Sequence, residues 1–409
     1  MNTRFRCRSC NSTNGSLFLD LGLQPLANNL LKPEDLFKPE PKVPLRLEVC
    51  EDCWLLQITD LVPPVTLFSE YLYFSSFSEA LLKHSKAAAE RYIREFALNG
   101  HSHVIEIASN DGYMLQTFQN AKIPCTGIEP ASNIAEVSKK RGIKTVVEFF
   151  GNALATRLAT QGEQADLILG NNVFAHAPET NDFTAGLATL LKQEGNIVLE
   201  FPYAVDLIEH TEFDTIYHEH VFYFTLSAVV PLFERHRLEI FRVERIPIHG
   251  GSLRLFASHA GARPVETSVT LLLNDEKSKG VNSLHYYEGF ADQVREIKRD
   301  LCELLGKLKA EGKALAAYGA SAKGSTLLNY FGIGKETLEF VADRSTHKQG
   351  RLTPGMHIPI LPPEKLLELR PEYTLLLTWN FAEEILSQQQ AYRESGGRFI
   401  VPIPKVKLA

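Results

Sequence analysis

Two copies of one local pattern constrain the fold of this chain most. Each copy is a short apolar run, then a turn of small or polar residues, then a segment with helical spacing. The copies are "HVIEIASNDGYML", from His103, and "KALAAYGASAKGSTLLNYFG", from Lys313. Further apolar runs and helical segments alternate after each copy, which predicts two doubly wound α/β domains in succession.

The strands after the first copy indicate a nucleotide cofactor. About twenty residues on, "CTGIEPAS" reads as a second strand that ends in Glu129, and an acid there suits hydrogen bonds to ribose hydroxyls. The dinucleotide fingerprint GxGxxG is absent, because the turn reads A-S-N-D-G. "RLEIFRVERIPIHGGSLRLFASHAG" reads as two strands joined across "HGGS", so the parallel units close with an antiparallel pair.

This order is typical of class I S-adenosylmethionine (SAM) methyltransferases, and an α/β domain without a cofactor is the alternative. A polar turn at a helix start brings backbone N–H groups close to a ligand. The residues expected at the cofactor lie in this turn and at the ends of the strands: Glu106, Ala108, Ser109, Asn110, Asp111, Gly112, Glu129, Pro130, Asn171 and Asn172.

The second copy follows a long amphipathic segment, which predicts a connecting helix from Tyr287 to about Gly312. Its turn, from Gly319 to Ser325, is small and carries one cation, Lys323, at a helix start. Backbone N–H groups and a lysine would suit a phosphate or diphosphate. A tight turn with a surface lysine explains the same residues, and the local sequence leaves both interpretations open.

Two Cys-x-x-C pairs, "CRSC" and "CEDC", lie near the N-terminus, thirty-nine residues apart. Each pair can present two thiolates to one tetrahedral Zn²⁺, so we expect a closed, structural zinc site rather than free or redox thiols. The intervening "LDLGLQPLANNLLKPEDL" is expected to be irregular chain. The predicted zinc ligands are Cys7, Cys10, Cys50 and Cys53.

Composition excludes some classes of function. The 409 residues carry a net charge of −6, which argues against a general nucleic-acid binder. No apolar run is long enough for a bilayer, and "MNTRFRCRSC" lacks the apolar stretch of a secretion signal. We therefore expect a cytoplasmic protein with neither a membrane nor a nucleic-acid partner.

The stretch "DTIYHEHVFYF", from Asp214, concentrates two imidazoles, a carboxylate and a phenol. In an extended segment Tyr217 and Glu219 face one way, while His218 and His220 face the other. These side chains can reach one site only if the segment turns. A metal is a weaker interpretation, because no third ligand stands nearby at metal-like spacing.

Nine motifs in order resemble one family over nearly the whole chain: "LDLGLQPLANNLLKP", "YLYFSS", "EIASNDGYML", "NNVFAHAP", "YHEHVFYF", "IHGGSLR", "AYGASAKGSTLLNY", "DRSTHKQGRLTPGMHIPI" and "TWNFAEEI". The family is that of the SAM-dependent sugar C-methyltransferases of branched deoxysugars, including the nucleotide-sugar C-3-methyltransferases of the D-tetronitrose type. The resemblance implies a zinc-binding domain (1–66), a class I SAM domain (67–285) and a Rossmann-like α/β domain (286–409). Ala108 is a departure, because the broader class usually has glycine there.

The resemblance also implies a reaction on a dTDP-4-keto-deoxysugar. A base removes the proton at C-3, which is acidic because it lies next to the C-4 ketone, and the enolate takes the methyl group of SAM. His220 matches the base, Tyr217 and Glu219 match its functional neighbours, and His176 is a candidate enolate stabiliser. Tyr73 and Ser75 join the SAM contacts. The residues expected at the nucleotide sugar are Tyr318, Ser321, Lys323, Asp343, Lys348, Asn380 and His249.

Two other functions are compatible with these residues. An O- or N-methyltransferase of a related sugar or small metabolite needs a base but no ketone. A non-catalytic protein with a zinc ribbon and a relic SAM fold predicts no turnover and a dispensable His220. The sequence does not identify the sugar, the C-3 substituent, the nucleotide base, the stereochemistry or the oligomeric state.

Overall fold

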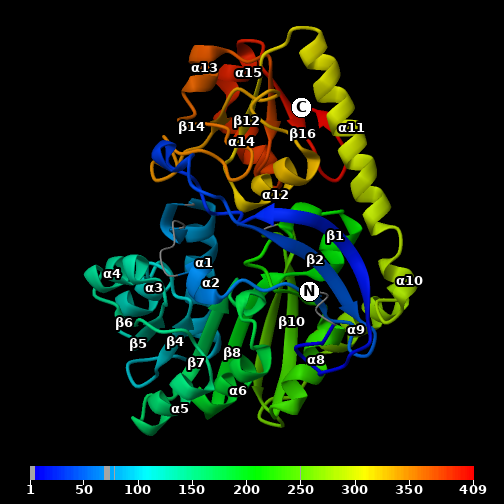
Figure 1. The fold of residues 1–409 in the computed structure, drawn as a ribbon. Coiled ribbons are helices and arrows are strands. Elements are labelled where there is room, and N and C mark those ends of the chain that lie inside the picture. Colours follow the sequence, from blue (N-terminus) through cyan, green and yellow to red (C-terminus); the bar gives the residue numbers. More distant parts are fainter. Residues whose placement is uncertain (1–4, 69–73, 78, 249) are drawn as a thin grey trace.

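The computed structural model describes residues 5–68, 74–77, 79–248 and 250–409. Two α/β domains lie at opposite ends of the molecule, and the N-terminal strands arch across the region between them (Figure 1). The long helix α11 runs along one side and reaches the C-terminal domain. Tyr73 and His249, expected at the cofactor and the sugar, lie outside the described residues.

The central domain has the sheet order β10-β11-β8-β7-β4-β5-β6. Its β4 to β8 strands are parallel, and β11 lies antiparallel between β8 and β10. The predicted parallel set closed by an antiparallel pair is confirmed. The strands are β4 (Val104–Ile107), β5 (Cys125–Ile128), β6 (Lys144–Val146), β7 (Ala165–Asn171), β8 (Leu191–Pro202), β10 (Leu238–Ile246) and β11 (Ser252–His259).

Amphipathic helices cover this sheet and bury apolar residues such as Leu154, Leu187 and Phe233 against it. Helix α2 precedes β4 in the chain, and helix α3 follows the turn after β4. The helices are α1 (Pro64–Phe68), α2 (Glu79–Glu95), α3 (Leu115–Asn120), α4 (Ser132–Lys140), α5 (Asn152–Thr160), α6 (Thr180–Leu190), α7 (Ala204–Glu209), α8 (Leu226–Arg235) and α9 (Thr267–Lys279). Short 3-10 turns are η2 (Ser75–Phe77), η3 (Phe174–His176) and η4 (Phe213–Thr215).

The C-terminal domain has the order β14-β13-β12-β15-β16-β17, with β17 antiparallel at its edge. Its other pairs are parallel, which confirms a second doubly wound sheet. The strands are β12 (Leu315–Tyr318), β13 (Val341–Ala342), β14 (Ile360–Leu361), β15 (Tyr373–Leu376), β16 (Arg398–Val401) and β17 (Lys407–Leu408).

The connecting helix is interrupted near its predicted start. Gly289 has φ +81°, and this left-handed residue separates α10 (Leu284–Tyr287) from α11 (Phe290–Ala310). The remaining helices of this end of the chain are α12 (Ala322–Phe331), α13 (Lys365–Leu369), α14 (Ala382–Gln388) and α15 (Gln390–Glu394), with the 3-10 turn η5 (Trp379–Phe381).

The N-terminal sheet corrects one expectation. The chain between the cysteine pairs is not wholly irregular, because β1 (Gly15–Pro25) pairs antiparallel with β2 (Lys42–Cys50). Register shifts within β1 break its alternation of apolar and polar residues, and this disguises the strand in the sequence. The sheet continues through β3 (Leu56–Ile58) to β9 (Phe222–Tyr223), which follows directly on the "YHEH" stretch.

Residues 26–41 connect β1 to β2 and carry the 3-10 turn η1 (Pro33–Asp35). This connection is bound to the C-terminal domain. Leu31 and Leu352 exchange two backbone hydrogen bonds of 3.0 and 2.8 Å. Glu40 accepts hydrogen bonds from the Gly355 N–H, at 2.8 Å, and pairs with His357, at 3.0 Å. The N-terminal part of the chain therefore contacts both α/β domains.

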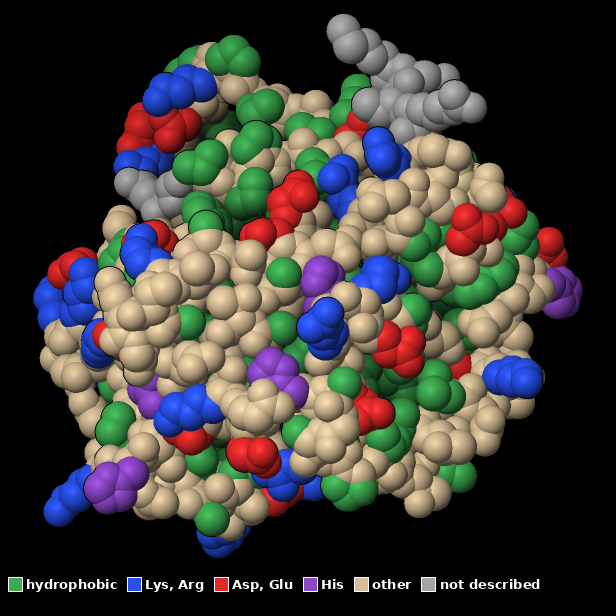
Figure 2. Space-filling model, turned by 90° about the horizontal axis from the view of Figure 1, so that it is seen from below, with side chains coloured by type: hydrophobic (Ala, Val, Ile, Leu, Met, Phe, Trp, Pro, Cys, Tyr) green, Lys and Arg blue, Asp and Glu red, His purple; other side chains and the backbone are tan. Residues whose placement is uncertain are grey.

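On the face seen in Figure 2, basic and acidic side chains are interspersed across the described part of the surface. Among the helices that the structure describes, none combines the length and the apolar composition needed to cross a bilayer.

The packing of the C-terminal domain against the end of β1 can be tested at Gly355. A Cβ there would overlap the side-chain oxygen of Asn329 and lie 3.1 Å from Pro25. Gly350 has a similar φ, +78° against +70°, but a Cβ there would meet nothing within 4 Å. We expect Gly355→Ala to lower the free energy of unfolding by about 1–3 kcal/mol more than Gly350→Ala, because only the first overpacks. Denaturant unfolding of both variants measures the difference, and equal losses would contradict this account of the contact.

Candidate active site

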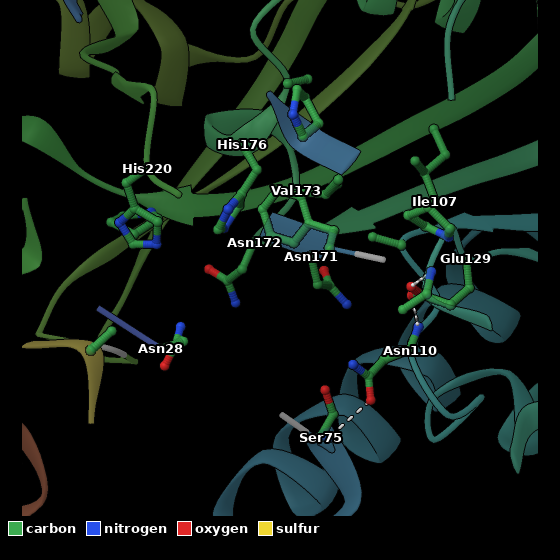
Figure 3. A pocket seen from close by; sticks show the side chains of 18 of the residues that line it. Asn28, Ser75, Ile107, Asn110, Glu129, Asn171, Asn172, Val173, His176 and His220 are labelled. Carbon is green, nitrogen blue, oxygen red and sulfur yellow. Dashed lines mark hydrogen bonds between the residues drawn. The ribbon is translucent and has the colours of Figure 1, made fainter. Parts of the chain in front are cut away.

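One large cavity, of about 820 Å³, lies where the three parts of the chain meet. Asn28 comes from the N-terminal part, Asn110 and Glu129 from the central domain, and Ser321 and Lys323 from the C-terminal domain. Figure 3 shows His176 and His220 at one side of this space, Glu129 and Asn110 at the other, and Asn171 and Asn172 between them. A cavity of this size holds a small organic ligand, and ligand sites in open α/β sheets lie at the carboxyl ends of the strands.

The turn after β4 carries the cofactor half of the cavity. Glu129 accepts hydrogen bonds from the backbone N–H groups of Asn110 and Ala131, both at 2.9 Å. The Asn110 side-chain oxygen accepts the Ser75 N–H at 2.9 Å. Burial raises the pKa of Glu129, and the two N–H donors act against this shift. A carboxylate fixed in this way can offer its remaining lone pairs to ribose hydroxyls, so the residues present fit SAM.

Ala108 adopts φ +53°, the left-handed region that favours glycine. This explains physically why glycine is usual at that position in the broader class. The methyl group of Ala108 lies in the cavity wall, beside Asn110 and Pro130.

Four of the residues predicted at the cofactor lie behind the cavity wall. Glu106 is buried, and burial, followed by the charges of Asp111 and Glu129, raises its pKa well above the usual range. Asp111 pairs with Arg141 at 3.2 Å. A Cβ on Gly112, at φ +77°, would lie 2.8 Å from the Ser138 hydroxyl. The four residues are Glu106, Ser109, Asp111 and Gly112. From these positions they support the turn and do not reach a ligand in the cavity.

Phe149, Phe150 and Asp182 also line the cavity, and sequence reasoning missed them. The two phenylalanines follow the third parallel strand, β6, so the pair "FF" after that strand was the available signal. Asp182 accepts the Asn152 N–H at 3.1 Å, which joins the start of α5 to α6 beside the cavity.

The "YHEH" stretch turns, as the shared site requires. The His220 N–H donates to the Tyr217 carbonyl at 2.9 Å. This turn brings the Tyr217 hydroxyl to 2.7 Å from His220 Nε2. Both side chains line the cavity, and the ring of His176 meets that of His220 edge-on with 4.7 Å between centroids. The structure therefore brings together Tyr217, His220 and His176.

His176 is held as a neutral imidazole. Burial lowers its pKa to about 4, and the nearby backbone of Glu219 acts in the opposite direction. The ring also contacts Phe68 edge-on, with 5.7 Å between centroids. Near pH 7 this side chain can offer a ring N–H without carrying charge.

The other two members of the stretch point away from the histidine pair. His218 Nε2 lies 3.2 Å from the Pro44 carbonyl of β2. Glu219 is buried, and both of its oxygens accept hydrogen bonds of 2.8 Å from Asn28 Nδ2. Glu219 is absent from the cavity wall, whereas Asn28 is part of it.

The turn after β12 supplies the opposite end of the cavity. Four of the residues predicted to bind the nucleotide sugar line the cavity: Ser321, Lys323, Lys348 and Asn380. The Ser321 hydroxyl caps α12 by accepting the Gly324 N–H at 3.1 Å.

Two residues expected at the sugar lie elsewhere. Asp343 accepts the Ala320 N–H at 2.8 Å and so supports the turn, as Glu129 does in the central domain. Tyr318 lies in an apolar cluster with Phe340, Leu376 and Phe399, which does not suit sugar contact.

Buried acids surround Lys323. Its Nζ lies 3.9 Å from Glu212 and 4.7 Å from the centre of the Trp379 ring. Burial raises the pKa of Glu212 to about 7, and Lys323 acts against this shift. Trp379 Nε1 donates to the buried Asp214 at 2.7 Å, and burial raises the pKa of Asp214 as well. Lys323 thus faces the cavity beside two buried acids whose raised pKa values favour their neutral forms.

The four N-terminal cysteines converge as a metal site. Their sulfur atoms all lie within 4.8 Å of one another, with separations of 3.5 Å for Cys7–Cys53 and 3.6 Å for Cys10–Cys50. A tetrahedron with Zn–S bonds of about 2.3 Å has sulfur atoms about 3.8 Å apart, so the cluster fits Zn²⁺. The first knuckle is also docked, because the Asn181 amide and the Arg235 guanidinium donate to the Ser9 carbonyl at 2.9 and 3.0 Å.

Together the sheet order, the Glu129 turn and the cysteine cluster define a SAM-dependent methyltransferase with a structural zinc site. Three family models match the chain: "Putative zinc binding domain" over residues 7–68, "Methyltransferase domain" over 81–242 and "C-methyltransferase C-terminal domain" over 247–404. The chain is 36% identical to the C-methyltransferase NovU of Streptomyces niveus over 98% of this chain and 96% of that protein. It belongs to the C-methyltransferase family. The boundaries at 66 and 285 stay predictions.

Solved structures with a similar fold include the magnesium protoporphyrin IX methyltransferase of Synechocystis PCC 6803, with 12% identity and a TM-score of 0.34 over 44% of this chain and 79% of that one. A SAM-dependent methyltransferase of Clostridium acetobutylicum has 7% identity and a TM-score of 0.35 over 44% of this chain and 92% of that one.

The zinc site is expected to organise the "YHEH" turn. Cys53 precedes β3, and β3 pairs with β9, where Leu56 faces Tyr223. We expect Cys50→Ser to abolish zinc binding and to speed hydrogen exchange at the amides of 221–224, because this pairing then loses its anchor. SAM affinity should change by less than about threefold, since the cofactor wall belongs to the central domain. Metal analysis, exchange mass spectrometry and calorimetry give the three readouts, and unchanged exchange at 221–224 would contradict the link.

The low pKa of His176 predicts a pH effect on stability. The unfolded side chain titrates near 6.5 and the folded one near 4, so the unfolded state binds more protons between these values. Stability from this group therefore rises with pH from about 4 to 6.5 and is constant above. We expect His176→Asn to flatten the pH dependence of the free energy of unfolding in that window. Urea unfolding at pH 4.5, 5.5 and 7.5 tests it, with the exposed His285→Asn as control, and parallel profiles for His176→Asn and the wild type would refute the assignment.

Proposed function

We propose that this protein transfers a methyl group from SAM to C-3 of a dTDP-4-keto-deoxysugar through an enolate, in the synthesis of branched deoxysugars. The observation that carries this proposal is the arrangement of Tyr217, His220 and His176 in one cavity, between the cofactor turn and the turn of Lys323. The similarity to a C-methyltransferase over nearly the whole chain supports a carbon acceptor.

A carbon acid needs a base and a partner for the charge that develops on its carbonyl oxygen. In the proposed reaction His220 takes the C-3 proton, the C–H electron pair forms the C-3=C-4 bond, and the carbonyl π pair moves onto the C-4 oxygen. Tyr217 holds the orientation of the His220 ring through the 2.7 Å hydrogen bond between its hydroxyl and Nε2. SAM, when bound, supplies the electrophilic methyl carbon that takes the electron pair of C-3.

His176 is the proposed partner of the enolate oxygen. A neutral imidazole donates a hydrogen bond without the cost of a buried charge, and its low pKa makes full proton transfer to the enolate unfavourable. It therefore stabilises the oxyanion and leaves the C-3 electron pair available for carbon–carbon bond formation.

The C-terminal turn is proposed to bind the diphosphate of the nucleotide sugar. Lys323 and Lys348 both line the cavity near the start of α12, where backbone N–H groups also favour an anion. With the diphosphate bound there, the sugar ring would lie between the lysines and the histidine pair.

The test is mass spectrometry of the protein with SAM and a set of dTDP-4-keto-6-deoxyhexoses. The expected product is heavier by one methylene, and nuclear magnetic resonance should place the new methyl on C-3. His220→Asn should lower kcat by at least about 100-fold, the usual contribution of a general base. A methyl group on oxygen or nitrogen would overturn the enolate mechanism.

Proton abstraction can be measured without methyl transfer. In D₂O without SAM, the wild type should exchange the C-3 hydrogen for deuterium, and His220→Asn should not. Lys323→Ala should raise the KM for the nucleotide sugar by about tenfold or more while its C-3 exchange at saturation persists, since an interfacial charge–phosphate contact is lost. An unchanged KM would remove Lys323 from the diphosphate site.

A further inference from the structure

Among the described residues 26–41, which connect β1 to β2, Asn28 is the one that lines the cavity. It lies three residues beyond the end of β1, in a tight turn where the Asn29 N–H donates to the Leu26 carbonyl at 3.0 Å and the Leu30 N–H to the Asn28 carbonyl at 2.9 Å. In Figure 3 its side chain lies on the same side of the cavity as His220, away from Glu129. Its place beside the base needs an explanation.

The backbone around Asn28 is fixed from both sides. Upstream, β1 pairs with β2 as far as Pro25, which faces Lys42. Downstream, Leu31 pairs with Leu352 of the C-terminal domain. The turn is thus held across the domains, so Asn28 occupies a defined position rather than a free loop.

The orientation of the Asn28 amide is also fixed. Its Nδ2 donates to both oxygens of the buried Glu219, so the amide nitrogen faces the carboxylate. A carboxylate can only accept hydrogen bonds, so the amide atom that faces Glu219 is the nitrogen. The Oδ1 carbonyl is then the acceptor on the other side of the amide. A charge-assisted pair of this kind is stronger than a neutral hydrogen bond, so the amide resists rotation.

We infer that Asn28 Oδ1 binds a hydrogen-bond donor on the sugar ring, a hydroxyl or an amino group at the carbon that is methylated, and that Glu219 is the positioning residue that aims it. This rests on the proposed function. Asn28 and the proposed base His220 both line the cavity and lie on the same side of it in Figure 3, so a sugar whose reacting carbon meets His220 would also face Asn28. Glu219 then acts through Asn28, rather than on the proton.

The zinc-binding part of the chain would then contribute directly to the acceptor site of the catalytic domain. The cysteine cluster and β1 carry the turn that supplies Asn28, and β3 holds β9 directly after His220. Metal binding would then shape the acceptor site as well as the fold.

The test compares two substrates in three proteins. The substrates are dTDP-4-keto-6-deoxysugars that differ only in a 3-hydroxyl or 3-deoxy carbon, and the proteins are the wild type, Asn28→Ala and the exposed neighbour Asn29→Ala. We expect the wild type and Asn29→Ala to prefer the 3-hydroxyl substrate by about 10- to 100-fold in kcat/KM, since the 3-deoxy sugar leaves the Asn28 carbonyl without a hydrogen-bond donor. Asn28→Ala should reduce this preference to within about threefold, mainly by weakening use of the 3-hydroxyl substrate.

Glu219→Gln separates positioning from direct chemistry. A glutamine can still accept one hydrogen bond from Asn28, so the preference should fall partway, while C-3 deuterium exchange at saturating sugar stays within about threefold of the wild type. Exchange lowered as far as in His220→Asn would overturn the positioning role and make Glu219 part of proton transfer.

Three further outcomes decide the inference. A wild-type preference that survives in Asn28→Ala would overturn it. Loss of zinc or of SAM affinity in Asn28→Ala, but not in Asn29→Ala, would make Asn28 a structural residue and overturn it as well. Absence of product and of C-3 exchange in the wild type with both sugars would instead refute the proposed function on which it rests.

Discussion

The pairing of β3 with β9 is the contact on which the site depends. It joins the sheet beside the cysteine cluster to the residues that directly follow His220. The Ile58 N–H adds a hydrogen bond of 2.9 Å to the Val221 carbonyl, and the Val221 N–H donates to the Ala175 carbonyl at 2.8 Å, next to His176. This short ladder of backbone hydrogen bonds therefore positions the chain at both His176 and His220. A four-thiolate metal site is a suitable anchor for it, because a site built from so few residues gains its rigidity from coordination rather than from core volume.

Buried acids give the two halves of the cavity a common plan. In each α/β domain a carboxylate after the second parallel strand accepts a backbone N–H from the turn after the first: Glu129 for Asn110, and Asp343 for Ala320. The bond holds the turn open toward the ligand, and the donors offset part of the cost of burying the charge. The two halves differ in their basic side chains, since the lysines that line the cavity, Lys323 and Lys348, both come from the C-terminal domain. This asymmetry suits an anionic sugar nucleotide on that side and a sulfonium on the other.

Much of this plan could be predicted from the sequence, because it depends on local patterns. The two strand–turn–helix units, the acid at Glu129 and the cysteine pairs each lie within a short window whose spacing decides the geometry. Features that depend on contacts between distant segments could not be predicted. The strand β1 follows from its pairing with β2, the position of Tyr318 from the core around it, and the partnership of Asn28 with Glu219 spans 191 residues. The turn at Tyr217–His220 was a condition of the hypothesis, and tertiary contacts supply it.

The two imidazoles explain why burial matters to the proposed chemistry. With 4.7 Å between ring centroids, two cationic rings would repel each other. Burial keeps His176 neutral near pH 7, so in the proposed reaction the pair gains one proton, which His220 takes from the substrate. The Tyr217 hydroxyl, 2.7 Å from Nε2, stabilises the resulting cation without adding a charge of its own. The same desolvation that lowers the pKa of His176 thus separates the two roles that a carbon acid requires, a base that gains a proton and a donor that keeps one.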